Sequence, residues 1–330
     1  MSRFHSCFMK LGAFFAFIFL QSVSAWAEPY VYVTNNLRII RVDCATGNRV
    51  RVQDDSPGVE PLYTDLWGIC AQDDTNDVFF VVDYRGEESR IIRVTVREED
   101  GALYGQRELV SDQNSTGPAL VDPYSLAYFN TSIFVTLPHA SQILKVNAST
   151  GERTLLCTGF DGNIDPPLIM PTDIERHQLN YLVTADQLGR SVIRIDPDTG
   201  ERVLISSDER GSGPAFIAPR CIAIEPTGKI LVTDGYDQNG PKFRIIRVDP
   251  HTGDRTILSS NETGTGPVAG SNILDISALE DGQILFADPS SRDIFGSASL
   301  LEADQTTGNR AVVSGLSRGT GPYLGYSSLV

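Results

Sequence analysis

The sequence has few of the residues from which catalytic centres are usually built. Its 330 residues include 4 histidines and 5 cysteines. It has no Gly-x-Ser-x-Gly motif, the mark of an α/β-hydrolase nucleophile, and no cysteine pair with the spacing of a zinc site. No helical period of 3.6 residues is present either. These absences disfavour a serine hydrolase, a zinc enzyme and a helical solenoid.

Long apolar runs and basic charge are also scarce. Beyond residue 27 no stretch approaches the ~20 apolar residues of a membrane-spanning helix. Lysine and arginine number 27 against 42 acidic residues, which gives a formal charge of −15. Such an acidic chain cannot neutralise a phosphate backbone, so nucleic acid is a poor candidate partner. Cations and basic surfaces are better ones.

The first 27 residues have the pattern of a secretory signal peptide. Arg3 and Lys10 form a basic start, residues 11–20 are apolar, and residues 25–27 read Ala-Trp-Ala. We predict cleavage after Ala27 and a single domain over residues 28–330, exported to the periplasm or secreted. Removing two basic residues leaves a mature chain of charge −17 (−15 − 2).

A turn of the type Asp-x-x-Thr-Gly-x-Arg recurs about every fifty residues. Its arginines are Arg49, Arg153, Arg202, Arg255 and Arg310, with Arg107 ending a degenerate copy that has a longer hairpin through Asp100-Gly101. In the fifth copy, four short β-branched runs lie at 220–225, 229–234, 243–249 and 255–259. A four-stranded unit of this length is stable only when stacked on neighbours. The repeat therefore predicts an all-β, six-bladed β-propeller with four antiparallel strands per blade.

The two ends of the chain predict how the ring closes. The mature chain starts at the second strand of a blade, residues 30–34, and residues 321–330 resemble the segment that leads into a first strand. We expect the C-terminal strand to join the N-terminal blade, which would remove the open edges of the ring, and we expect a monomer. The remaining cysteines fall on different blades and are expected to be buried free thiols: Cys44, Cys70, Cys157 and Cys221.

The repeat unit Ile-x-Arg-Val-Asp-Pro-x-Thr-Gly, followed by Gly-x-Gly-Pro and a strand ending Val-Thr-Asp, resembles the NHL-repeat propellers. More loosely it is similar to the gluconolactonase-like and strictosidine-synthase-like propellers. The resemblance covers the whole mature chain. It implies a propeller that serves as a binding platform, a carbohydrate-associated module or a metal-dependent lactone hydrolase.

By analogy with other propellers, we expect the site on the face that carries the Gly-x-Gly-Pro loops and the loops between second and third strands, with the Thr-Gly-x-Arg turns on the opposite face. Candidate binding residues on that face are Asp83, Asp186, Asp234, Asp288, His139 and Trp67. The four aspartates end second strands and could form an acidic rim. Their regular recurrence equally suits a local role, in which each bonds the amides of its own loop. Trp67 could stack on a ligand or pack between blades.

Positions that break the repeat carry more information about chemistry. Near the start of the first strands, Asp173 and Asp275 stand where the other blades have Gly, Ser or Cys. The gluconolactonase-like enzymes place divalent-cation ligands in this region, so the resemblance implies a possible Ca²⁺ site at Asp173 and Asp275, assisted by Asn272. The glutamate of that family has no counterpart on the first blade, where Ser328 stands.

Two functions remain open from the sequence. The first is an exported binding module for a protein or glycan ligand, because no asymmetric catalytic set is present. The second is a divalent-cation-dependent hydrolase of a lactone or ester, motivated by Asp173 and Asp275.

Overall fold

The computed structural model describes residues 30–35, 37–55, 62–72, 77–159, 165–237, 240–289 and 298–324. The predicted signal peptide, residues 1–27, and the predicted closing strand after residue 324 lie outside these ranges. Within them the chain is all-β apart from two 3-10 turns, η1 (Gly86–Glu88) and η2 (Pro138–Ala140).

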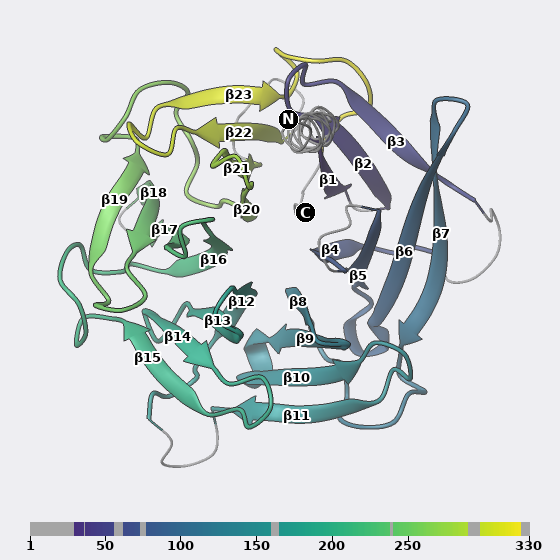
Figure 1. Cartoon of the computed structure of the whole chain (residues 1–330), viewed down its shortest axis with the longest axis horizontal. Coiled ribbons are helices and arrows are strands. Elements are labelled where there is room, and N and C mark those ends of the chain that lie inside the picture. Colours follow the sequence, from purple (N-terminus) through teal and green to yellow (C-terminus); the bar gives the residue numbers. More distant parts are fainter. Residues whose placement is uncertain are drawn as a thin grey trace, which may run out of the picture.

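The strands follow one another in sets around a common axis (Figure 1). The first set comprises β1 (Tyr30–Asn35), β2 (Arg38–Asp43) and β3 (Arg49–Asp54), and the second β4 (Leu66–Ala71), β5 (Val78–Asp83), β6 (Arg90–Glu99) and β7 (Ala102–Ser111). The third comprises β8 (Leu126–Phe129), β9 (Ser132–Leu137), β10 (Gln142–Asn147) and β11 (Arg153–Thr158), and the fourth β12 (Pro171–His177), β13 (Tyr181–Asp186), β14 (Ser191–Ile195) and β15 (Arg202–Ser206). The fifth comprises β16 (Pro219–Ile224), β17 (Ile230–Asp237), β18 (Gly240–Val248) and β19 (Arg255–Ser260), and the last β20 (Asp275–Ala278), β21 (Ile284–Asp288), β22 (Ser299–Ala303) and β23 (Arg310–Ser314).

Within each of the last four sets, the strands form an antiparallel sheet in chain order, with the first strand nearest the axis and the last at the outside (Figure 1). The core lies between the sheets. Six buried apolar clusters each combine side chains of two sets, and one of them joins β1 and β2 to β21 and β22. A single sheet of this kind could not bury both of its faces alone.

The repeat alignment holds at the level of strand register. The repeated arginine pairs with the third strand at the same place in every set: Val42↔Arg49, Val94↔Arg107, Val146↔Arg153, Ile195↔Arg202, Val248↔Arg255 and Ala303↔Arg310. The degenerate copy is thereby confirmed, with its longer hairpin turning at Asp100-Gly101 between β6 and β7. In the fifth set, Asp249 Oδ1 accepts from His251 N–H at 2.9 Å, as an Asx-turn requires.

The first two sets depart from the expected separate blades. Their outer strands β3 and β7 pair in parallel, which merges the described strands of both sets into one seven-stranded sheet. The long β6–β7 hairpin reaches β3, and Gly105 permits the approach: a Cβ there would lie 2.9 Å from Val52 Cγ1. A hairpin of ordinary length could not make this contact.

The side chain of the repeated arginine forms hydrogen bonds that hold each set of strands against the one before it. We call this contact the clasp. Arg255 on β19 is buried and donates to Pro214 O at 2.7 Å, Ser206 Oγ at 2.7 Å and Ser207 O at 2.6 Å, all on the fourth set or the loop that follows it. Its backbone N–H also donates to Ser212 O at 2.8 Å. The arginines of the first, third and last sets make the same type of contact: Arg49, Arg153 and Arg310.

This clasp corrects the expected placement of the two motifs. The Thr-Gly-x-Arg turn of one set touches the Gly-x-Gly-Pro loop before it, so the two motifs do not lie on opposite faces. The outer strands run along the rim (Figure 1), which brings the start of one outer strand beside the end of the preceding one. The sequence pattern did not reveal this tilt.

Candidate functional site

The four repeated aspartates are buried and bond the loops that precede their own first strands. Asp186 accepts from Ile169 N–H and Met170 N–H, both at 2.7 Å. The other three accept from loop amides in the same way: Asp83, Asp234 and Asp288. None of the four is more than 4% exposed. Each aspartate therefore has the local role that the sequence allowed, in which it bonds the amides of its own loop. The buried carboxylates present little surface to a ligand.

These contacts define one surface of the molecule, which we call the loop face. They hold the ends of the second strands against the connections that lead from one set of strands to the next. The loop face therefore comprises those connections and the turns between second and third strands. His139 lies on this face, exposed in η2.

Trp67 belongs to an aromatic cluster near the axis. Its ring stacks on Tyr84 with centroids 4.5 Å apart and meets Tyr124 edge-on at 5.4 Å, while its indole N–H donates to Asp65 Oδ2 at 2.9 Å. The three rings are half-buried. Trp67 therefore packs between neighbouring sets of strands and keeps part of its surface exposed, which combines the two interpretations drawn from the sequence.

An arginine joins this cluster to the opposite side of the axis. Arg220, at the start of β16, donates to the Tyr124 hydroxyl and to Asn272 Oδ1. Its guanidinium carbon lies 5.7 Å from the centre of the Tyr124 ring. The contacts link the third, fifth and last sets of strands. Asn272, predicted as a metal ligand, thus uses its carbonyl oxygen to accept from Arg220.

The structure brings Asp173 and Asp275 to one small cavity near the axis, which Glu175, Ser125 and Cys221 also line. Asp173 is buried, and both of its carboxylate oxygens accept hydrogen bonds. Oδ1 accepts from the Ser125 hydroxyl and from Ile174 N–H at 2.8 Å, and Oδ2 accepts from Ile222 N–H at 2.6 Å. Donors from three sets of strands therefore meet on this carboxylate.

Glu175 is the residue that the sequence analysis missed. It lies two residues after Asp173 on β12, and period-two alternation on the innermost strand directs both side chains to the same side. Burial and the nearby carboxylates of Asp173 and Asp275 hold the pKa of Glu175 well above its usual range. Burial likewise raises the pKa of Asp173 to about 6, against the lowering effect of its hydrogen bonds. Both carboxylates therefore take up a proton at a higher pH than exposed ones do.

Within the described ranges, no group of three or more His, Cys, Asp or Glu side chains is arranged to hold a metal ion. Calcium at Asp173, Asp275 and Asn272 stays a prediction. The four cysteines of the described residues are buried thiols that form no disulfide, as expected. His177 is buried, with its ring against Tyr181 and Nε2 2.9 Å from Gly228 O.

Of the thirteen large apolar side chains that are exposed in the described ranges, seven lie on the loop face. Val268 is 77% exposed, Tyr323 66% and Leu188 64%. Four further members of this group are exposed to a lesser degree: Leu37, Leu62, Val121 and Ile169. In the described turns between first and second strands, Leu179 is the one such residue, and the other five lie on the outer strands: Val50, Leu109, Leu155, Val203 and Ile257. Of the described turns and connections, those of the loop face therefore expose the most large apolar side chains, a feature typical of a surface that contacts another molecule.

Comparisons with known proteins show the fold. No family model matches the chain, and no curated protein matches it by sequence. The structure is similar to one titled as a nidogen/laminin complex, with a TM-score of 0.60, 14% identity, and coverage of 91% of this chain and 97% of the other. It is also similar to a "putative 6-phosphogluconolactonase" from Bacteroides fragilis, with a TM-score of 0.56, 14% identity, and coverage of 93% and 99%.

A second protein with that title, from Bacteroides uniformis, matches with a TM-score of 0.55, 12% identity, and coverage of 92% and 99%. At these identities the matches show the β-propeller fold that the repeat predicts, and no more. No helix in the described part of the chain is long and apolar enough to cross a membrane.

Proposed function

We propose that this chain is an exported, non-enzymatic propeller that binds a protein partner through its loop face. The observation that carries the proposal is the share of exposed apolar side chains on that face, which also carries the half-buried aromatic cluster of Trp67, Tyr84 and Tyr124. Aromatic residues are enriched where binding energy is concentrated in protein interfaces. One structural neighbour is part of a protein complex, which supports binding as a role for this fold.

The loop face is rigid where its apolar residues are displayed. Val268 and Tyr323 each follow the proline of a Gly-x-Gly-Pro loop, and the carbonyl of that proline accepts from a clasp arginine at 2.8 Å and 2.6 Å, respectively. The next residue in each loop, Ala269 or Leu324, is buried. An anchored loop loses little conformational entropy on binding, which favours affinity.

The test uses the mature chain as bait against an envelope or extracellular protein fraction. A captured protein counts only after it has been purified and its affinity measured by biolayer interferometry. We expect Val268→Glu combined with Leu188→Glu to weaken binding at least 10-fold. Leu179→Glu, the matched change on the other face, should leave the affinity within about twofold, since scattered surface changes are usually neutral. Equal effects of both changes, or turnover of a small molecule by the pure chain, would overturn the proposal.

We further propose that the ring has six blades and is closed by the C-terminal strand. The contacts of the last described residues support this: Asn35 Nδ2 donates to Tyr323 O at 2.8 Å, and Ala298 N–H donates to Leu324 O at 3.0 Å. These contacts place Tyr323 beside the end of β1 and Leu324 beside the start of β22. Truncation after Leu324 should then lower the unfolding midpoint sharply, whereas an unchanged midpoint would contradict closure.

A calcium-dependent lactone or ester hydrolase is the second candidate, because Asp173, Glu175 and Asp275 line one cavity. Calcium prefers carboxylate oxygens, and two or three such groups could contribute to a site. Titration calorimetry with Ca²⁺ tests this candidate. Binding that Asp275→Asn removes would support it, whereas heat that is the same in wild type and variant, or no heat at all, would eliminate it.

A further inference from the structure

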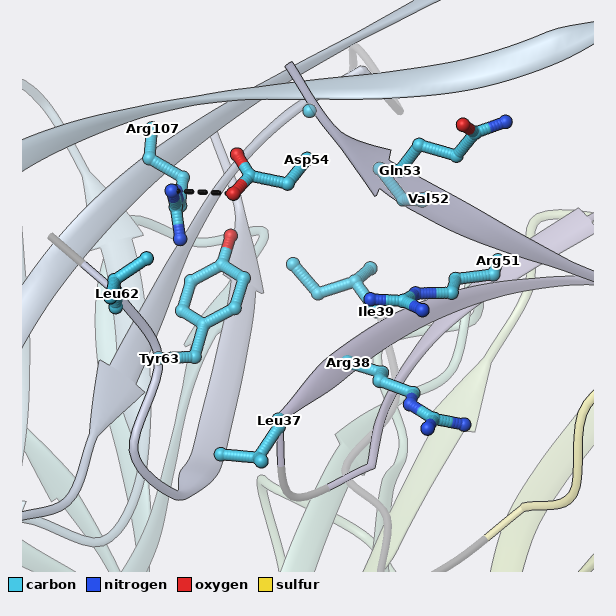
Figure 2. Close-up of a pocket in the computed structure, with 11 residues that line it drawn as sticks. Leu37, Arg38, Ile39, Arg51, Val52, Gln53, Asp54, Leu62, Tyr63 and Arg107 are labelled. Atoms are coloured by element: carbon cyan, nitrogen blue, oxygen red, sulfur yellow. Dashed lines mark hydrogen bonds and ion pairs between the residues drawn. The ribbon is translucent and has the colours of Figure 1, made fainter. Parts of the chain in front are cut away.

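A cleft of about 170 Å³ lies where the first set of strands meets the second. Its floor is formed by the buried side chains of Ile39 on β2 and Val52 on β3. Tyr63 forms one wall, and Arg107 with Asp54 closes the far end (Figure 2). The cleft lies at the rim, so it is separate from the axial cavity of Asp173 and Asp275.

The cleft exists because this junction breaks the repeat. Arg107 occupies the register of the clasp arginines, but it pairs with the carboxylate of Asp54, Nη2 to Oδ2, at 2.7 Å. Its guanidinium carbon lies 5.2 Å from the centre of the Tyr63 ring. The Arg107 side chain is 5% exposed. Arg107 and Asp54 thereby form one end of the cleft.

Among the described residues that line the cleft, three arginines face one aspartate. Arg107 is neutralised by Asp54, and Arg97 at the nearby hairpin is paired with Asp55 and Glu99. Arg51 is exposed and has no ion-pair partner among the described residues, and its guanidinium is directed toward the side of Tyr63 (Figure 2). Arg38 is directed away from Tyr63 and Arg107 in the same view.

We propose that this cleft binds an acidic sugar, with the carboxylate of a uronic acid held by Arg51. A guanidinium presents two parallel N–H donors that match one carboxylate. Because the mature chain carries a net charge of −17, its field disfavours a phosphate dianion more than a single carboxylate.

The other residues that line the cleft match the C–H and hydroxyl groups of a sugar ring. The Tyr63 ring and the apolar floor can pack against its C–H surface, and the Arg107–Asp54 pair with Gln53 offers donors and acceptors to hydroxyl groups. Burial raises the pKa of the Tyr63 hydroxyl. That hydroxyl therefore stays a hydrogen-bond donor throughout the neutral range.

The experiment is a ligand-observed NMR titration of the full mature chain with sodium glucuronate at constant ionic strength. A single sugar of this size should bind with a dissociation constant on the order of 1 mM. Glucose, which lacks the carboxylate, should bind at least 10-fold more weakly. Arg51→Gln should weaken glucuronate binding at least 10-fold, and Tyr63→Leu should weaken it severalfold.

Arg38→Gln is the matched control. It removes an arginine that also borders the cleft, with the same change of net charge, and it should leave binding within twofold. The proposal is overturned if glucuronate does not bind, if glucose binds as tightly, or if Arg38→Gln and Arg51→Gln weaken binding equally. The last result would mean that only the general charge of the surface attracts the anion. None of the variants changes Val268 or Leu188, the residues that test the proposed protein partner, so the two tests have separate outcomes.

Discussion

Replacing Arg255 by methionine should destabilise the protein far more than replacing an exposed arginine. The guanidinium of Arg255 donates to the carbonyls of Pro214, Ser207 and Arg210 and to the Ser206 hydroxyl, at distances from 2.6 to 3.0 Å. Methionine keeps the apolar stem but leaves those buried acceptors without their donor. At about 1 kcal/mol for each lost bond, and more where water cannot reach the acceptor, the free energy of unfolding should fall by about 3–5 kcal/mol.

Urea denaturation followed by circular dichroism measures this effect, with the slope m checked for a change of mechanism. Arg41→Met is the control. Arg41 forms an ion pair with Glu98 at 3.0 Å, and the two side chains are 24% and 52% exposed, so its loss should cost no more than about 1 kcal/mol. If Arg255→Met shifts the midpoint no further than Arg41→Met does, the clasp does not hold the sheets together.

Three further predictions concern local geometry and pH. Gly213→Ala should lower the free energy of unfolding by more than about 2 kcal/mol, because the new Cβ would lie 2.0 Å from Arg255 O. Gly101→Ala is the control: its φ is also positive, but no atom lies within 4 Å of the new Cβ, so it should cost only about 1 kcal/mol. Thermal or urea unfolding measures both. Asp173 has a raised pKa of about 6, so its contribution to stability is present at low pH and is lost as pH rises from about 4 to about 6. Asp173→Asn should remove that decline from the pH profile of the unfolding midpoint. Asp249, whose pKa the hydrogen bond from Lys229 lowers to about 2, stabilises above its unfolded pKa and loses this effect toward pH 2. Asp249→Asn should therefore destabilise at pH 7 and be nearly neutral at pH 2, and an equal cost at both pH values would contradict this account.

The sequence predicted the features that repeat. Six copies of the turn with equal register followed from the spacing of the arginines, because each copy must build the same strand pair. The burial of the repeated aspartates fits the same logic, since a role that recurs in four sets of strands serves the fold. What the pattern could not supply was the tilt of the outer strands, which places Arg255 against Ser212.

The features that do not repeat were harder to predict. Glu175 was missed because the comparison of blades stopped at one position of the first strand, two residues short of it. The Arg107–Asp54 pair could not be predicted because Arg107 keeps the register of the other arginines, and nothing in the repeat marks Asp54 as its partner. Residues that contact each other between sets of strands are about fifty positions apart in the sequence, so no local sequence pattern predicts these contacts.

The clasp also explains how one repeat can serve both stability and binding. Each Gly-x-Gly-Pro loop is fixed through its proline carbonyl, and the second residue after the proline is buried: Leu120, Phe216, Ala269 or Leu324. The residue between them is exposed and is alanine in two loops and a large apolar residue in the other two: Ala119, Ala215, Val268 or Tyr323. Because that side chain is exposed, a change there should cost the fold little. Under the proposed function, the loop face is a surface on which partner specificity can vary while the repeat that supports it stays constant.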